Sequence, residues 1–272
     1  MSGALVQLVA QGVQDVYLTN GLSTESFFKM KYTRHTNFSQ TPKLIKTLEA
    51  SAGEVVSIKL SSIGDLVNKL WLESDSDIMA KMEDCKFTLF IGGQEIDRFD
   101  TTFLTDVWTI YMAETYTKAQ MINNKTSSSN NTFFPLHFFF CDNSMFLPLL
   151  CLQYHEVEIR IEFPRSISKL RMYGNFIYLD TDERKQMVDK TMEILIKQVQ
   201  KHTFKLTDGV NNIPLDAINH PVTSLYWGYK ALDRIVENDK FCFSSADIQL
   251  NGTPLFENMS NITAANMATS IN

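Results

Sequence analysis

The 272-residue sequence has few cysteines and shows no pairing pattern among them. The thiols are scattered along the chain and form no Cys-x-x-Cys motif: Cys85, Cys141, Cys151 and Cys242. This distribution argues against a disulfide framework, which would need regularly spaced cysteines. We interpret the four residues as small buried hydrophobic side chains of a protein made in a reducing compartment, the cytoplasm.

Concentrated positive charge and long apolar runs are also missing. The formal net charge is −6 and the chain contains no long block of Lys or Arg, so direct binding to nucleic-acid phosphates is not expected. No stretch approaches the roughly 18 apolar residues of a membrane-spanning helix. The N-terminus lacks a positively charged start followed by an apolar run and predicts no secretory signal. We expect a protein that is soluble until it assembles.

The sequence offers no cluster of metal ligands. Asp180–Asp182 begins like a calcium-binding loop, but Lys185 stands where that loop requires Gly, and Thr191 where it requires Glu. The histidines are isolated from one another: His35, His137, His155, His202 and His220. We therefore predict no metal site and no cofactor site.

Catalytic motifs are lacking as well. The chain contains neither a G-x-S-x-G motif nor a Gly-rich phosphate-binding loop. Cys141 and His137 could be imagined as a nucleophile and its base, but both lie in an aromatic run that is typical of a core strand and its turn. The sequence predicts no catalytic residue and a protein that is not an enzyme.

Asn-x-Ser/Thr triplets are frequent, as expected in an Asn-rich chain. They begin at Asn37, Asn124, Asn130, Asn251, Asn258 and Asn261. Two of them lie in the polar tract Asn123–Asn131, which we expect to form an exposed loop. In a protein made in the cytoplasm, the triplets alone do not predict glycans.

Aromatic residues are abundant, with 19 Phe and 9 Tyr, and many segments have the residue pattern of β-strands. Alternation of apolar and polar residues is strict in Val157–Phe163. The expected strands follow one another without βαβ alternation, which favours an all-β, antiparallel jelly-roll β-sandwich with eight strands between Val55 and Leu179. The strand-like runs are Val56–Leu60, Leu66–Leu72, Cys85–Ile91, Phe133–Cys141, Cys151–Phe163 and Leu170–Leu179.

Three other segments have different patterns. Leu5–Leu18 carries an apolar stripe at helical spacing and predicts an amphipathic arm, which either packs on its own domain or projects from it to contact a partner protein. Asp100–Gln120 is compatible with a short helix or a long loop. Asp180–Arg184 predicts a capped helix with an acidic first turn.

The chain beyond this helix indicates the start of a second β-unit. His220-Pro221 predicts an extended entry into a strand. We expect residues 251–272 to be poorly ordered or only loosely packed, because they offer few large apolar anchors. Only four short strands are expected here: Phe204–Leu206, Leu225–Tyr229, Phe241–Phe243 and Ile248–Leu250. The predicted organisation is an N-terminal arm (1–25), a first jelly roll (26–182), a connector (183–202) and an incomplete second jelly roll (203–272).

Several ordered strings resemble the major capsid proteins of large icosahedral double-stranded DNA viruses of eukaryotes. They are Gln14–Thr19, Phe27–Lys29, Tyr32–Phe38, Ile91–Arg98, Leu147–Leu150 with Leu152–Val157, Leu179–Arg184, and Asn219–Pro221 with Leu225–Trp227. Any one of them alone would be weak, whereas their shared order along the chain makes the resemblance specific.

The resemblance implies two consecutive jelly rolls per chain and three chains per pseudo-hexagonal capsomer of an icosahedral shell. It implies a virion protein made in the host cytoplasm. Its expected partners are two further copies, neighbouring capsomers, minor capsid proteins and the internal viral membrane, without direct contact to nucleic acid. Members of the family usually continue beyond the position of Asn272, so the chain resembles a C-terminally truncated member: a fragment, an exon or a degenerate paralogue. A minor or vertex capsid protein and a carbohydrate-binding β-sandwich of the virion surface remain as alternatives.

Overall fold

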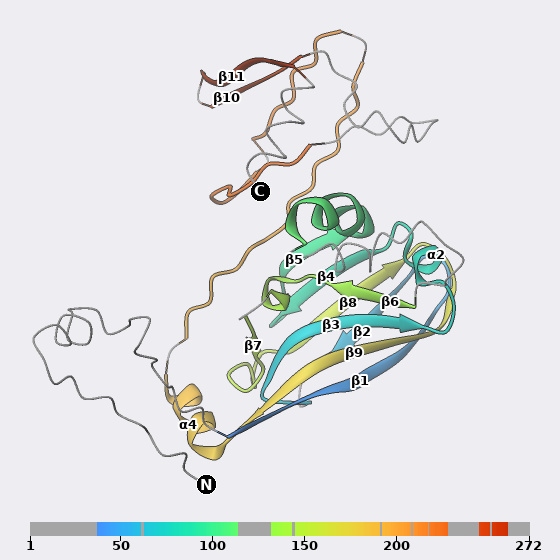
Figure 1. The fold of residues 1–272 in the computed structure, drawn as a ribbon, viewed down its shortest axis with the longest axis vertical. Coiled ribbons are helices and arrows are strands. Elements are labelled where there is room, and N and C mark those ends of the chain that lie inside the picture. The colour runs from blue at the N-terminus through green and yellow to red at the C-terminus, as the bar shows by residue number, and fades with distance from the viewer. Residues whose placement is uncertain are drawn as a thin grey trace, which may run out of the picture.

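A computed structural model describes most of the chain between Asn37 and Ser260, and its main body is a β-sandwich (Figure 1). The described residues are 37–60, 63–113, 132–142, 145–190, 192–207, 209–216, 218–227, 245–250 and 252–260. The predicted arm Leu5–Leu18 and polar tract Asn123–Asn131 therefore lie outside the described residues.

The first sheet has the strand order β1-β9-β3-β6, with β7 also paired to β3. Every pairing in it is antiparallel. Because β6 and β7 pair with different halves of β3, they share one edge position. The strands are β1 (Phe38–Ala50), β9 (Ile167–Leu179), β3 (Leu66–Ser74), β6 (Phe133–Leu136) and β7 (Leu147–Pro148).

The second sheet has the order β2-β8-β4-β5 and is also antiparallel throughout. Each sheet thus contains strands from the beginning and from the end of the sandwich, such as β1 with β9 and β2 with β8. Each sheet has four strand positions, and the eight positions together form the two packed sheets of a jelly roll. The antiparallel β-sandwich predicted from the sequence is confirmed. The strands are β2 (Glu54–Lys59), β8 (Val157–Phe163), β4 (Lys86–Ile91) and β5 (Gln94–Asp100).

The core lies between the two sheets and is rich in phenylalanine. In β8 the inward residues are those of the predicted alternation, and β9 supplies Leu170, Met172 and Phe176 from the other layer. Burial of these side chains is the main favourable contribution to folding. The largest buried side chains include Phe87, Phe134, Phe138, Phe140, Phe163 and Phe176.

The turn between β4 and β5 has the conformation expected from its two glycines. Gly92 has φ +60° and Gly93 has φ +81°, both in the left-handed region that favours glycine. Ile91 and Gln94 pair directly across this turn, so the hairpin loop has two residues.

Helices are short and lie at the ends of strands. Asp180 caps α4 (Thr181–Asp189) by accepting a hydrogen bond from the Thr181 N–H at 2.7 Å, as predicted. Asp100–Gln120 contains the π-helix η1 (Phe103–Met112), so the helical alternative was correct for its described part. The other two are α2 (Ile78–Met82) and the 3-10 helix η2 (Phe139–Cys141).

Three predicted strand boundaries in the sandwich were wrong. The sandwich begins with β1, which sequence analysis missed because much of that strand is exposed on both faces and lacks alternation. The run Phe133–Cys141 leaves the sheet after Leu136, because its following phenylalanines are buried without alternation in η2. The strand expected from Cys151 begins at Val157, after turns in which the Tyr154 side chain is exposed.

The segment after α4 differs more from the prediction. Residues 204–206 and 225–227 are not strands, since neither has a neighbouring strand to complete its backbone hydrogen bonds among the described residues. His220 has φ +73° rather than the expected extended conformation. The strand expected at Ile248–Leu250 is part of β10 (Ser245–Leu250).

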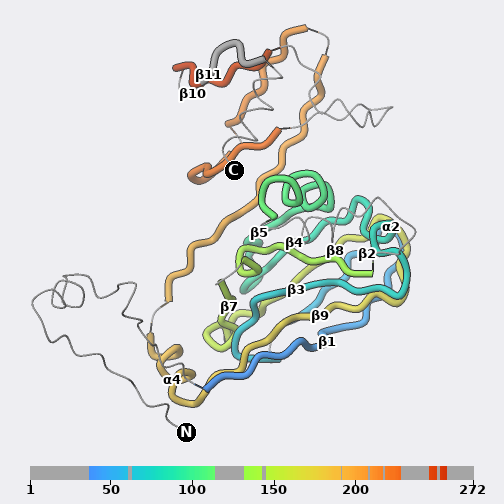
Figure 2. The backbone as a smooth tube through the Cα atoms, in the orientation of Figure 1, coloured from blue at the N-terminus to red at the C-terminus, as the bar shows by residue number. Residues whose placement is uncertain are grey.

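After residue 250 the strand β11 (Thr253–Ser260) pairs antiparallel with β10, which corrects the expectation of poor order for this strand. The exposed side chain of Leu255 agrees with the alternative of loose packing. Phe241–Phe243 and residues 261–272 lie outside the described residues. Figure 2 shows the extended segment that leads from α4 past the sandwich towards this hairpin.

Candidate assembly surface

The three described thiols do not form a reactive site. Burial raises the pKa of Cys85 and of Cys141 to about 12, and it also raises the pKa of Cys151. These thiols are therefore protonated, and poorly nucleophilic, at neutral pH. They are free cysteines, as the sequence indicated.

Two of the described histidines, His137 and His202, lie against aromatic rings. The Nε2 atom of His137 lies 3.0 Å from Asp142 Oδ1, and its ring lies 5.0 Å from that of Trp108. The His202 ring lies beside Phe204. Among the residues that the structure describes, no three His, Cys, Asp or Glu side chains gather as a metal site would require, and no helix is long and apolar enough to cross a bilayer.

The outer face of the second sheet is covered by paired charges. Arg160 donates two hydrogen bonds of 2.9 Å to Glu158, and its guanidinium lies 4.2 Å from the centre of the Phe90 ring. The Arg160 and Ser57 hydrogen bonds lower the pKa of Glu158. Further ion pairs on this side are Lys59–Glu156, Lys86–Glu162 and Arg98–Glu95. The charged side chains of this face can be solvated, so the outer face of the second sheet can be exposed to water.

The outer face of the first sheet has a different character, because apolar side chains cross it from strand to strand. Leu44 pairs with Tyr173, Tyr173 with Trp71, and Trp71 with Pro135. The Trp71 ring stacks on that of Tyr173 with centroids 5.8 Å apart, and lies 6.1 Å from the ring of Phe133. We call these five residues the apolar row. Its side chains are half-buried, except Leu44, which is 49% exposed.

Charged groups flank the apolar row on both sides along the strand direction. Lys69 lies on one side, beside Asn175, which donates a 2.7 Å hydrogen bond to Asn68. On the other side, Arg171 lies 2.6 Å from Asp75 and 3.7 Å from Glu73. Lys69 has no ion pair among the described residues.

Residues 197–201, which we call the strap, lie against the free edge of β5. The Gln198 amide donates to the Ile96 carbonyl, and the Val199 N–H donates to Asp97 Oδ1 at 3.0 Å. Burial raises the pKa of Asp97 to about 6, although hydrogen bonds from the Val199 and Arg98 N–H groups act in the opposite direction. The strap thereby covers an edge that could otherwise pair with another strand.

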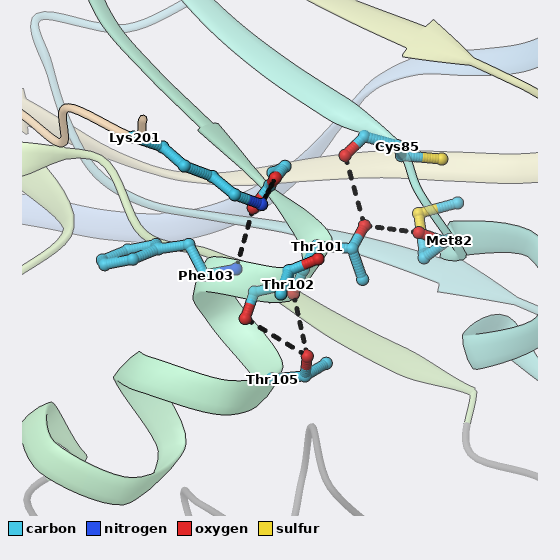
Figure 3. A network of polar contacts seen from close by, with 8 residues as sticks. Met82, Cys85, Thr101, Thr102, Phe103, Thr105 and Lys201 are labelled. Carbon is cyan, nitrogen blue, oxygen red and sulfur yellow. Dashed lines mark hydrogen bonds and ion pairs between the residues drawn. The ribbon is translucent and has the colours of Figure 1, made fainter. Parts of the chain in front are cut away.

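One aspartate joins the strap to the π-helix. Asp100 accepts a 2.9 Å hydrogen bond from the Phe103 N–H at the start of η1, and it also pairs with Lys201. In the same network Thr101 donates towards the carbonyls of Met82 and Cys85 (Figure 3). This joint fixes β5, η1 and the strap together.

The segment 192–227, which contains the strap, leaves many apolar side chains exposed. Within the segment, the Gln200 amide exchanges two hydrogen bonds with the Asn219 backbone. The segment also contacts η1, where the Tyr226 ring lies 5.0 Å from the Tyr111 ring. The exposed large apolar residues are Met192, Leu195, Ile196, Phe204, Leu206, Val210, Ile213, Leu215, Val222, Leu225, Tyr226 and Trp227. This segment is therefore a candidate interaction surface.

Sequence analysis did not identify the apolar row or the strap. A signal for the row existed, because Trp71 occupies the outward phase of β3 between the buried Leu70 and Leu72. No local signal could have identified the strap, since its partners lie about 100 positions away in the sequence.

Comparison with known proteins gives a consistent picture. The family model described as "Major capsid protein N-terminus" matches residues 26–197. The major capsid protein of Pyramimonas orientalis virus is 34% identical over an alignment that covers 94% of this chain and 72% of the relative. That of Paramecium bursaria Chlorella virus 1 is 31% identical, with 84% and 60% covered.

A solved structure agrees with these relatives. The quasi-atomic model of the PBCV-1 virus capsid superposes with a TM-score of 0.53 and 25% sequence identity, over 64% of this chain and 50% of the other. The chain thus spans about half of the PBCV-1 capsid chain, and 58% of the Phaeocystis pouchetii virus relative.

Proposed function

Because the chain belongs to the major capsid protein family of large DNA viruses and is a structural protein of the virion rather than an enzyme, we propose that three copies associate into one pseudo-hexagonal capsomer of an icosahedral shell. The resemblance described above supplies the three-fold stoichiometry. Assembly with other capsid subunits follows from family membership, whereas the homotrimer is part of this proposal.

The observation that carries the proposal is the exposed apolar surface of residues 192–227. Burying such side chains removes apolar area from water and stabilises association by roughly 25 cal/mol per Å² before the costs of binding. A segment anchored to its own sandwich by the strap is held in position to place those side chains against another chain.

The proposal extends to the wider shell. Neighbouring capsomers, minor capsid proteins and the internal viral membrane are the further partners, and the chain is made in the host cytoplasm. Its domains are an arm (1–25), a first jelly roll (26–182), a connector (183–202) and the start of a second jelly roll (203–272).

Light scattering coupled to size exclusion tests the three-fold association. Three chains of 31.1 kDa predict a particle of about 93 kDa. Phe204→Asp places a charge on the exposed apolar segment and should shift the particle towards the monomer, whereas Tyr154→Asp, on an exposed turn of the sandwich, serves as the control. A monomeric wild-type protein that retains glycans would contradict the proposal and support a carbohydrate-binding module.

A further inference from the structure

We infer that the apolar row is a self-complementary contact surface, on which two copies of this chain pack face to face about a two-fold axis. This contact is distinct from the proposed three-fold association, because an isologous surface pairs two subunits and cannot close a ring of three. It would therefore join one capsomer to the next, and its occupant is a second copy of the chain.

The first argument is the chemistry of the row. An antiparallel sheet with one solvated face normally carries polar residues there, as the second sheet does. On the first sheet, Trp71, Tyr173 and Leu44 instead occupy adjacent outward positions on three neighbouring strands. Aromatic residues are enriched in interface cores, and this row places two of them, Trp71 and Tyr173, side by side.

The second argument is the order of charges along β3. Its successive outward residues are Lys69, Trp71 and Glu73, which places a cation, an aromatic ring and an anion in line. On the acidic side of the row, Glu73 and Asp75 both lie near the guanidinium of Arg171. Lys69 lies on the opposite side and has no ion pair among the described residues.

A two-fold axis running along the row satisfies both arguments. Rotation about it stacks Trp71 of one copy on Trp71 of the other and reverses the strand direction. Lys69 of each copy then faces Glu73 of the other. Packed sheets lie about 10 Å apart, a distance that these long side chains can span from both sides.

Charge reversal tests this arrangement by sedimentation velocity. Lys69→Glu or Glu73→Lys alone should place like charges opposite each other twice per contact and weaken association at least about tenfold. The double variant K69E/E73K restores both opposite-charge contacts and should recover association. An equimolar mixture of the two single variants should recover it as well. Lys86→Glu, on the outer face of the second sheet, is the matched control and should have no effect on association.

Apolar truncation tests the centre of the contact. Trp71→Ala should abolish pairing, whereas Val55→Ala, an exposed apolar residue on the outer face of the second sheet, should not. Thermal unfolding of each variant separates lost pairing from lost folding.

The outcomes distinguish this inference from the proposed function. Trimers that fail to pair, or that pair regardless of charge reversal, would overturn the inference and leave the three-fold association intact. Monomers that form charge-dependent dimers would support the inference and contradict the trimer. Protection of Trp71 from hydroxyl-radical footprinting in dilute, unassociated protein would show that the chain's own residues cover the row, which would also overturn it.

Discussion

At the scale of single residues, Asp97 shows how one buried carboxyl links the sandwich to the segment that follows it. The side chain is on the inner side of β5 at the sheet edge and accepts the Val199 N–H of the strap. Burial raises its pKa, so the folded state binds a proton more tightly than the unfolded state does. Its contribution to stability is therefore complete below about pH 4 and is lost as the pH rises through about 6.

Asp97→Asn should stabilise the protein at pH 7.5 by on the order of 1–3 kcal/mol, because the amide oxygen still accepts the Val199 N–H without a buried charge. The gain should disappear near pH 4, where Asp97 is protonated. Urea unfolding of both proteins at the two pH values measures this difference. Glu162→Gln, at an exposed carboxyl of the same sheet, is the control. A gain of equal size at both pH values would show that the buried charge is not its cause.

The two glycines of the β4–β5 turn give a second prediction at this scale. Gly93→Ala adds a Cβ that meets nothing within 4 Å, so it should cost only the left-handed strain of about 1–2 kcal/mol. Gly92→Ala should cost more, because its Cβ would lie 2.8 Å from His155 Nδ1. Adding His155→Ala should remove the excess cost of the Gly92 variant but not change that of Gly93→Ala. Equal stability of the two single variants in thermal unfolding would refute this reading of the turn.

At the scale of elements, strands buried on one face could be predicted and strands set by distant partners could not. The alternation of Val157–Phe163 is visible locally, because the inner face needs apolar residues and the outer face does not. In β1, the pairing of Phe38–Lys43 with the end of β9 defines the strand, and little of the side chains is buried. The same reasoning failed at Leu225–Trp227, where aromatic residues occur without a partner strand in the described part of the chain.

Limited proteolysis tests the boundary between the sandwich and the exposed segment. Trypsin should cleave rapidly beyond the strap, for example after the exposed Lys205, and leave a resistant core that ends close to Gln200. Lys201 should be cleaved more slowly because it is paired with Asp100. Mass spectrometry of the early fragments identifies the ends. A chain that resists cleavage through Asn272 would contradict the expected boundary.

At the scale of the whole molecule, the interleaved strand order brings residues that are far apart in the sequence onto common surfaces. The apolar row combines β1, β3, β6 and β9, and thus residues from Leu44 to Tyr173. The family and the sandwich were accessible from the sequence, because both depend on local strings and alternation. The proposed assembly surfaces were not, because they depend on strand register and on which face of each sheet points outward.

Electron cryo-microscopy of the purified particle tests the central claim most directly, namely that this chain is a jelly-roll building block of a viral shell. We predict a three-fold symmetric particle with a pseudo-hexagonal outline, in which each chain contributes a sandwich with the sheet orders β1-β9-β3-β6 and β2-β8-β4-β5. A particle without three-fold symmetry, or one whose sheets follow a different strand order, would contradict the account.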